Sequence, residues 1–247
     1  MKKTICLILA FIAILIIACN NPKTVPTIQD IEGNVYKTVK IGKQIWMAEN
    51  LKTTKYNDGR AIPNITVAGT WGAATTGAYC DFNNTPSNST TYGRLYNWYA
   101  VDNNAATKVV SNSGKNVCPT GWHVPSDAEW TTLEDYLTNN GYGYGGRGSD
   151  IGKSMANTSG WTTDPTAGNV GNDQASNNSS GFTALPSGYR NYHGSYDYIG
   201  DYAYWWSSTE SSTTYAYNRF MSYGYSIVYR DFDIKQDGFS VRCLKDN

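Results

Sequence analysis

The side chains best suited to chemistry in this sequence are a few cysteines. Cys6 and Cys19 lie within or at the end of an apolar N-terminal run, which leaves Cys80, Cys118 and Cys243 for the rest of the chain. These three are far apart in sequence, so they form none of the closely spaced pairs that bind zinc or carry out redox chemistry. Three thiols allow three different single disulfides, and spacing alone does not choose among them.

The two histidines, His123 and His193, have no cysteine or acidic partner at the spacing of metal ligands. The sequence also contains no Ser/His/Asp signature, phosphate-binding loop or Gly-x-Ser-x-Gly elbow. We therefore expect no metal site, no cofactor and no catalysis. His123 is expected to pack or hydrogen-bond at the entrance of a helix.

Acidic side chains offer two further kinds of chemistry. Glycoside hydrolysis requires a pair of carboxyl groups, so a hydrolase with an unrecognised site is one alternative. Two such pairs are Asp231 with Asp233 and Glu134 with Asp135. Separately, Asp30, Glu32 and Asn34 place oxygen ligands at alternate positions, which can suit calcium. The same residues suit a hairpin turn, and we favour the turn.

The most informative segment is 189–233, where many tyrosines stand among Ser, Gly, Asn and Asp. This composition is typical of binding loops, because tyrosine supplies rigid contact area at low entropic cost and small polar residues adapt to a partner. Aromatic faces also stack on sugar rings. The candidate ligand-binding residues are Tyr215, Tyr217, Tyr223, Tyr225, Tyr229, Asp231, Trp205 and Trp206. The alternative is that these tyrosines simply suit strands and that the tryptophan pair belongs to the core.

The N-terminus has the pattern of an export signal. Two lysines precede an apolar run, 5–17, that is too short to span a membrane. The run ends in Ala18-Cys19, which resembles the lipobox of bacterial lipoproteins. We therefore predict a signal peptide at 1–18, lipidation of Cys19 and a polar tether at 19–27. A cleaved signal with an incidental cysteine and an uncleaved anchor are the alternatives.

The expected location is the outer membrane, with the face left open. No aspartate follows Cys19, so the inner-membrane retention signal is absent, and so is an acidic surface-export patch. Residues 28–247 have a plausible size for one domain. The full chain carries 20 basic and 20 acidic residues, so no basic surface favours nucleic-acid binding.

The clearest predicted helix begins after Ser126. Ser126 and Glu129 form a capping box, apolar residues then recur on one face, and Gly141 ends the helix. A short helix is also predicted within 92–101 from the spacing of its apolar residues.

Strands are predicted where apolar and polar residues alternate between turn signals. The predicted ranges are 35–41, 44–51, 182–185, 202–207, 215–222, 226–231 and 238–244. Residues 141–181 are rich in Gly, Ser and Asn, so a long loop region with one short helix or strand is expected there. Short strands and few helices indicate an α+β domain.

Seven motifs in this order resemble the Fibrobacter succinogenes major paralogous domain (FISUMP) family of bacterial lipoproteins. They are Asp30–Val39, Trp46–Leu51, Tyr92–Trp98, Cys118–Ser126, Leu185–Arg190, Trp205–Glu210 and Gly238–Cys243. The resemblance covers about residues 28–245. It implies a fold better than a function, because the family is largely uncharacterised.

A more distant likeness concerns the fold. His123–Trp130 is similar to a helix start in formylglycine-generating enzymes, and Gly238–Cys243 is similar to their terminal strand. The likeness implies a C-type-lectin-like fold with twisted antiparallel sheets, a few helices and long irregular loops. Such a fold brings the termini together, which implies a Cys118–Cys243 disulfide and leaves Cys80 free and buried. The enzymes' copper-binding cysteine pair is not matched, so the likeness does not extend to their reaction.

The leading hypothesis is a non-catalytic, lipid-anchored protein that binds a glycan or a protein of another cell. One alternative is a structural or assembly subunit of the cell envelope. Another is a target of diversity-generating retroelements, which mutate adenines in C-terminal codons; residues 215–233 would then be the variable segment. The sequence motifs of calcium-dependent sugar binding in C-type lectins are absent.

Overall fold

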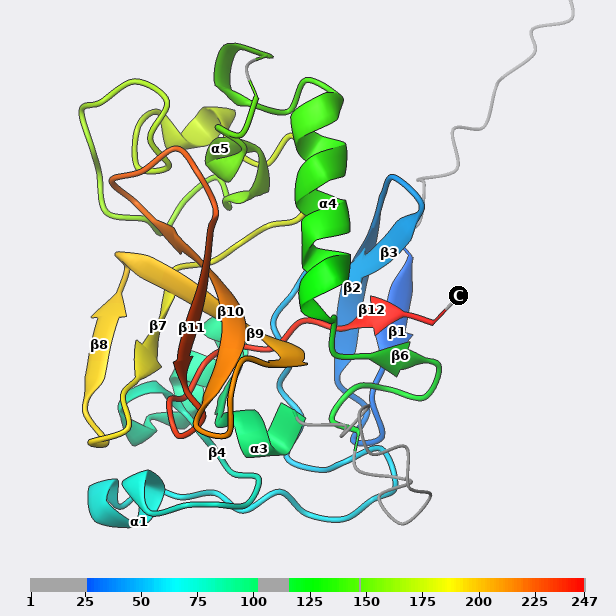
Figure 1. The fold of residues 1–247 in the computed structure, drawn as a ribbon, viewed down its shortest axis with the longest axis vertical. Coiled ribbons are helices and arrows are strands. Elements are labelled where there is room, and N and C mark those ends of the chain that lie inside the picture. Colours follow the sequence, from blue (N-terminus) through cyan, green and yellow to red (C-terminus); the bar gives the residue numbers. More distant parts are fainter. Residues whose placement is uncertain (1–25, 102–115, 147, 247) are drawn as a thin grey trace, which may run out of the picture.

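The computed structural model describes residues 26–101, 116–146 and 148–246, and it has an α+β architecture of curled, mostly antiparallel sheets with few helices (Figure 1). The predicted signal peptide and the lipidation site at Cys19 lie outside the described residues. Within the described residues, no helix is both long and apolar enough to cross a membrane.

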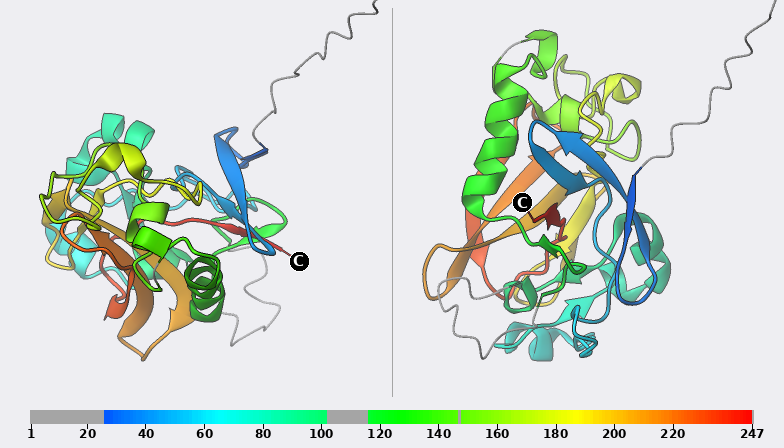
Figure 2. Two further views of the ribbon diagram at one scale, coloured as in Figure 1. Left: turned by 90° about the horizontal axis from the view of Figure 1, so that it is seen from above. Right: turned by 90° about the vertical axis from the view of Figure 1, so that its right-hand side faces the viewer.

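The first sheet joins the two ends of the described chain. Its strand order is β1-β2-β3-β12-β6, and neighbouring strands are antiparallel. The strands are β1 (Thr27–Gln29), β2 (Val35–Ile41), β3 (Gln44–Met47), β12 (Leu244–Lys245) and β6 (Trp122–His123). Figure 2 shows the first strands in blue and the last strand in red on the same side of the molecule. The prediction for 35–41 is confirmed in full, whereas the second strand ends four residues earlier than predicted.

The second sheet contains the longest strands. Its order is β11-β10-β9-β7-β8, with β7 and β9 parallel and the other pairs antiparallel. The strands are β7 (Ser187–Arg190), β8 (Tyr196–Ile199), β9 (Tyr202–Glu210), β10 (Tyr215–Ser222) and β11 (Tyr229–Ile234). The bounds of β10 are those predicted. A bulge between β9 and β10 at Ala216/Asn218 increases the local twist.

Helix α4 (Asp127–Asn139) lies between the two sheets (Figure 1). The predicted capping box is confirmed: Ser126 accepts a hydrogen bond from the backbone of Glu129, and the Glu129 carboxylate accepts one from the backbone of Ser126. Its apolar face, including Trp130, is fully buried against residues of both sheets. Trp130 packs against Trp46 of β3 at 4.8 Å between ring centroids and against Trp205 of β9 at 6.2 Å.

The remaining elements are short and are joined by long loops. They are α1 (Ala68–Gly72), β4 (Tyr79–Cys80), η1 (Phe82–Asn84), α2 (Pro86–Tyr92), β5 (Leu95–Tyr96), α3 (Trp98–Val101), η4 (Tyr144–Gly146), α5 (Gly152–Met155) and η5 (Gln174–Ser176). The short helix predicted within 92–101 is confirmed at Trp98–Val101 but is wrong at Leu95, which pairs with Cys80 as a strand. The strand predicted at 182–185 is not formed, and that predicted at 238–244 is reduced to single bridges at 238–240 and to Leu244 of β12.

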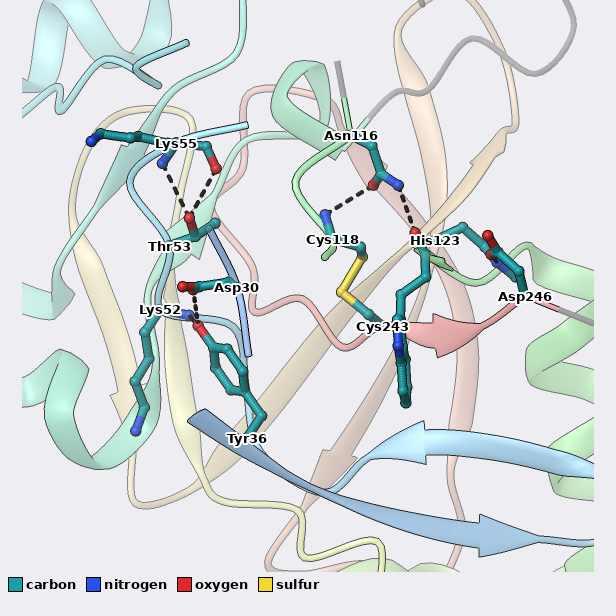
Figure 3. The surroundings of a disulfide bond; sticks show 11 residues. Asp30, Tyr36, Lys52, Thr53, Lys55, Asn116, Cys118, His123, Cys243 and Asp246 are labelled. Atoms are coloured by element: carbon teal, nitrogen blue, oxygen red, sulfur yellow. Dashed lines mark hydrogen bonds and ion pairs between the residues drawn. A yellow bond between two sulfur atoms is a disulfide. The ribbon is translucent and has the colours of Figure 1, made fainter. Parts of the chain in front are cut away.

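The disulfide implied by the family resemblance is confirmed. Cys118 and Cys243 are bonded, with their Cα atoms 5.8 Å apart, and the bond links the loop before β6 to the loop before β12. Figure 3 shows Asn116 beside it, donating to the carbonyl of Trp122 and accepting from the backbone of Cys118. Cys80 is free and buried, and burial raises the pKa of its thiol to about 11. This thiol is therefore protonated and unreactive at neutral pH.

Candidate functional site

The second sheet has two chemically different faces, because side chains alternate along each strand. In the antiparallel register Tyr204 of β9 lies beside Phe220 of β10, and Phe220 lies beside Tyr229 of β11. Tyr202 and Asp231 lie two residues along the same strands and so point to the same side. We call this side the tyrosine face; the other side, which packs against α4, is the helix-covered face.

The aromatic rings of the tyrosine face form a continuous layer. Phe220 stacks on Tyr229 at 4.6 Å between centroids and on Tyr204 at 5.4 Å. Tyr202 stacks on Tyr204 at 6.0 Å and contacts Tyr198 of β8 at 4.9 Å. Such ring pairs are favourable beyond the area that they bury, so the layer is rigid. Backbone pairing of the strands fixes its spacing.

The layer lines two adjoining hollows. The larger, of about 410 Å³, is lined by Tyr198, Tyr202, Tyr204, Phe220, Tyr225, Tyr229, Asp231 and Asp233. The smaller, of about 210 Å³, is lined by Tyr189, Asn191, Tyr192, Tyr204, Asp233, Asp237 and Phe239. Because Tyr204 and Asp233 line both hollows, the two hollows adjoin each other and together make one aromatic depression on this face of the sheet. We call it the tyrosine groove.

Three carboxyl groups line the groove: Asp231, Asp233 and Asp237. Burial and the neighbouring Asp231 raise the pKa of Asp233 to about 6, although a hydrogen bond from Asn218 opposes the shift. Burial and the neighbouring Asp233 raise the pKa of Asp237 to about 7. None of the three forms an ion pair within the described part of the chain. The groove is thus an aromatic surface whose carboxyl groups have no ion-pair partner among the described residues.

A family model for the Fibrobacter succinogenes major domain matches residues 39–245. The chain belongs to this family. The match runs from within β2 to the end of β12, so the family domain includes the second sheet, most strands of the first sheet, α4 and the tyrosine groove. No curated protein and no solved structure matches the chain.

The motifs that resemble the family lie mainly in its core. Trp205 donates from Nε1 to Oδ1 of Asn50 at 2.9 Å, and Arg242 donates from Nε to the same oxygen at 3.0 Å. The guanidinium of Arg242 also donates to the backbone carbonyls of Phe182 and Thr183. All of these except Thr183 are buried. These residues therefore hold the family fold together and do not form a ligand surface.

On the helix-covered face, the arginines Arg219 and Arg230 are both paired with carboxylates. Arg219, with no exposed surface, pairs with Asp127 at 2.7 Å and with Glu134 of α4. Arg230 lies over the ring of Tyr217 at 4.0 Å and also pairs with Asp127 at 2.9 Å. The Glu134 carboxylate, predicted as half of an acid pair, is therefore engaged by Arg219.

The structure divides the candidate ligand-binding residues among four environments. Tyr225, Tyr229 and Asp231 line the tyrosine groove as a group. Tyr215 and Tyr217 lie on the opposite face of β10, and Tyr223 packs against the core beneath the loop that follows β10. The assignment of Trp205 and Trp206 is wrong, because both are 0% exposed. Trp205 packs toward α4, and Trp206 donates to the carbonyl of Tyr96.

The list of candidate binding residues omitted most of the groove, although the segment 189–233 contains much of it. The omitted lining residues include Tyr198, Tyr202, Tyr204, Phe220 and Asp233. The period-two alternation of Tyr202 and Tyr204 was a usable signal, since it places both on one face of a strand. Tyr198 gave no such signal: its backbone adopts a left-handed φ of 62°, which is uncommon for a bulky residue.

The other candidate sites serve structural purposes. His123 lies between Asp246, 2.6 Å from Nδ1, and Glu129, 3.0 Å from Nε2, and the hydrogen bond with Glu129 is the main cause of its raised pKa. Asp30 accepts hydrogen bonds from the backbone of Asn34 and from the hydroxyl of Tyr36, which forms the predicted turn. No group of three or more metal-ligating side chains occurs among residues that the structure describes.

Proposed function

We propose that this protein is an exported, lipid-anchored and non-catalytic envelope protein that binds a glycan or protein ligand in the tyrosine groove. The observation that carries the proposal is the groove itself: a stacked aromatic layer left open on one face of a sheet whose other face is partly covered by α4. Large aromatic side chains normally contribute by burial. Here Tyr198 and Tyr225 are 51% and 49% exposed, so they have contact area available for a partner.

The N-terminal sequence supports the anchoring part of the proposal. The first described strand begins at Thr27, only eight residues after Cys19. A lipid on Cys19 would therefore hold the domain close to the membrane surface. Metabolic labelling with radioactive palmitate tests this: label should enter the chain and be lost in Cys19→Ser. Labelling that survives Cys19→Ser would contradict the anchor.

We also propose that the fold is C-type-lectin-like. The first and last strands share one sheet, and a disulfide joins the segment before α4 to the terminal strand, as the resemblance implies. Long irregular loops connect the short elements outside the two sheets, and such loops are the feature that lets folds of this kind carry binding surfaces.

A binding panel with matched variants tests the groove. The chain from Asn20 to Asn247 is screened against glycans and cell-surface proteins, with and without calcium. The first variant changes Tyr198, Tyr225 and Tyr229 to Ala; the control changes Tyr215 and Phe232 to Ala on the opposite face of the same sheet. We expect at least a tenfold loss of affinity in the first variant alone, with both variants folded by circular dichroism. Binding that the control abolishes and the first variant retains would contradict the proposal.

An assembly subunit of the envelope is the second candidate. Phe232 is 51% exposed and Tyr215 is 38% exposed, and their rings contact each other at 5.8 Å on the face opposite the groove. A stable partner that co-purifies and is lost in Tyr215→Ala/Phe232→Ala would favour this function.

A further inference from the structure

The tyrosine groove has an excess of negative charge that no ion pair among the described residues neutralises. Its lining contains three aspartates and no lysine, arginine or histidine. Elsewhere in the described chain, Asp127, Glu134 and Asp81 each face an arginine. The three aspartates of the groove have no such partner in the part of the chain that the structure describes.

At two other places in this chain, a tyrosine ring and a carboxylate lie close together, and an arginine side chain lies between them. On the helix-covered face, the Arg230 guanidinium lies 4.0 Å from the Tyr217 ring centroid while its Nε lies 2.9 Å from Asp127. At the β4–β5 pair, Arg94 lies 5.1 Å from the Tyr79 ring centroid and 3.2 Å from Asp81. In each case a tyrosine face and a carboxylate enclose a guanidinium, which both groups attract.

We propose that the groove recognises a basic segment of a protein partner, with arginine or lysine side chains lying between the tyrosine rings and the three aspartates. This inference rests on the proposed function, since it assumes that the groove is the ligand site. It narrows the ligand from a glycan or a protein to a peptide whose positive charges complement the aspartates of the groove.

A neutral ligand fits the groove less well for an electrostatic reason. Covering Asp231 and Asp233 with an uncharged molecule would remove water from two neighbouring carboxylates without supplying a counter-charge. A guanidinium or ammonium group offsets that cost and adds an attraction to the ring faces. Because Asp233 borders both hollows, a basic side chain in either one can reach it.

The test uses peptides that differ only in charge. An alternating Arg-Gly octapeptide is titrated against the chain from Asn20 to Asn247 by calorimetry at pH 7.5, and its citrulline counterpart supplies the same shape without charge. The protein variants are Asp231→Asn/Asp233→Asn and, as a matched control, Asp135→Asn at an exposed position of α4. We expect the citrulline peptide and the groove variant each to weaken binding at least tenfold, with Asp135→Asn within twofold of the parent. Higher salt should also weaken binding.

The outcomes separate this inference from the proposed function. Equal binding of arginine and citrulline peptides, or no loss in Asp231→Asn/Asp233→Asn, overturns the charge inference. The same holds if a neutral chitin tetrasaccharide binds the groove more tightly than the peptide, which would leave the groove as the ligand site. Tight binding of the aminated chitosan counterpart with no binding of the peptide would assign the positive charge to a glycan and would also overturn it. If no probe or panel ligand depends on Tyr198, Tyr225 and Tyr229, both proposals fail.

Discussion

The two faces of the second sheet are built from the same strands but are used differently. On the helix-covered face, Arg219 and Arg230 are paired with carboxylates, and Arg219 is fully buried beneath α4. On the tyrosine face, Asp231 and Asp233 have no ion-pair partner in the part of the chain that the structure describes, and the rings line an open groove. The contrast indicates that the helix-covered face stabilises the sheet. The tyrosine face can therefore carry aspartates and exposed rings that find their partners only when a ligand binds.

The largest expected effect comes from removing the buried ion pairs of Arg219 on the helix-covered face. Arg219→Met removes a fully buried guanidinium and leaves Glu134 without its partner, so we expect a loss of about 3–5 kcal/mol in the free energy of unfolding. Urea denaturation measures this. Arg230→Met is the control; its half-exposed ion pair should contribute about 1 kcal/mol or less. A loss below about 1 kcal/mol for Arg219→Met would contradict the division between the faces.

The second effect is a pH dependence specific to the tyrosine face. The folded-state pKa values of Asp233 and Asp237, about 6 and about 7, lie above the ordinary value, so folding favours their protonated forms. Stability from these groups is therefore highest below about pH 4 and falls as pH rises toward 7. Asp233→Asn/Asp237→Asn should come close to the parent near pH 4 and exceed it at pH 7.5 by at least about 2 kcal/mol. Chemical denaturation at both pH values checks this; a constant difference would contradict it.

The smallest expected effect concerns Tyr198, which contributes to the groove at a strained position. Its left-handed backbone costs a non-glycine residue about 1–2 kcal/mol, and glycine removes that cost while adding entropy to the unfolded chain. We therefore expect Tyr198→Gly to change the free energy of unfolding by less than about 1 kcal/mol while weakening ligand binding. Differential scanning calorimetry and the peptide titration measure the two quantities. A large destabilisation would assign Tyr198 a packing role.

The sequence predicted local structure well where local chemistry decides it. The capping box at Ser126 and the alternation in 215–222 specified the start of α4 and the bounds of β10. The helix expected at Leu95 failed because pairing with Cys80 across the chain overrides the local spacing. The disulfide followed from the family resemblance.

The site was predicted only in part, since a face cannot be assigned without the register between strands. Tyr217 and Tyr229 were grouped together, but Tyr217 lies opposite Phe232 and Tyr229 opposite Phe220, so they point to different sides. The adjacent pair Trp205 and Trp206 could not both lie on one surface of a regular strand. Both are buried because the sheet is covered at that point on either side.

The most direct test of the central claim locates the ligand on one of the two faces. The rings of all tyrosines are labelled with carbon-13, and their resonances are followed by NMR while the Arg-Gly octapeptide is added. The account predicts shifts at Tyr198, Tyr225 and Tyr229, with Tyr215 and Tyr217 unchanged. Shifts confined to Tyr215 and Tyr217, or none at a saturating peptide concentration, would contradict it.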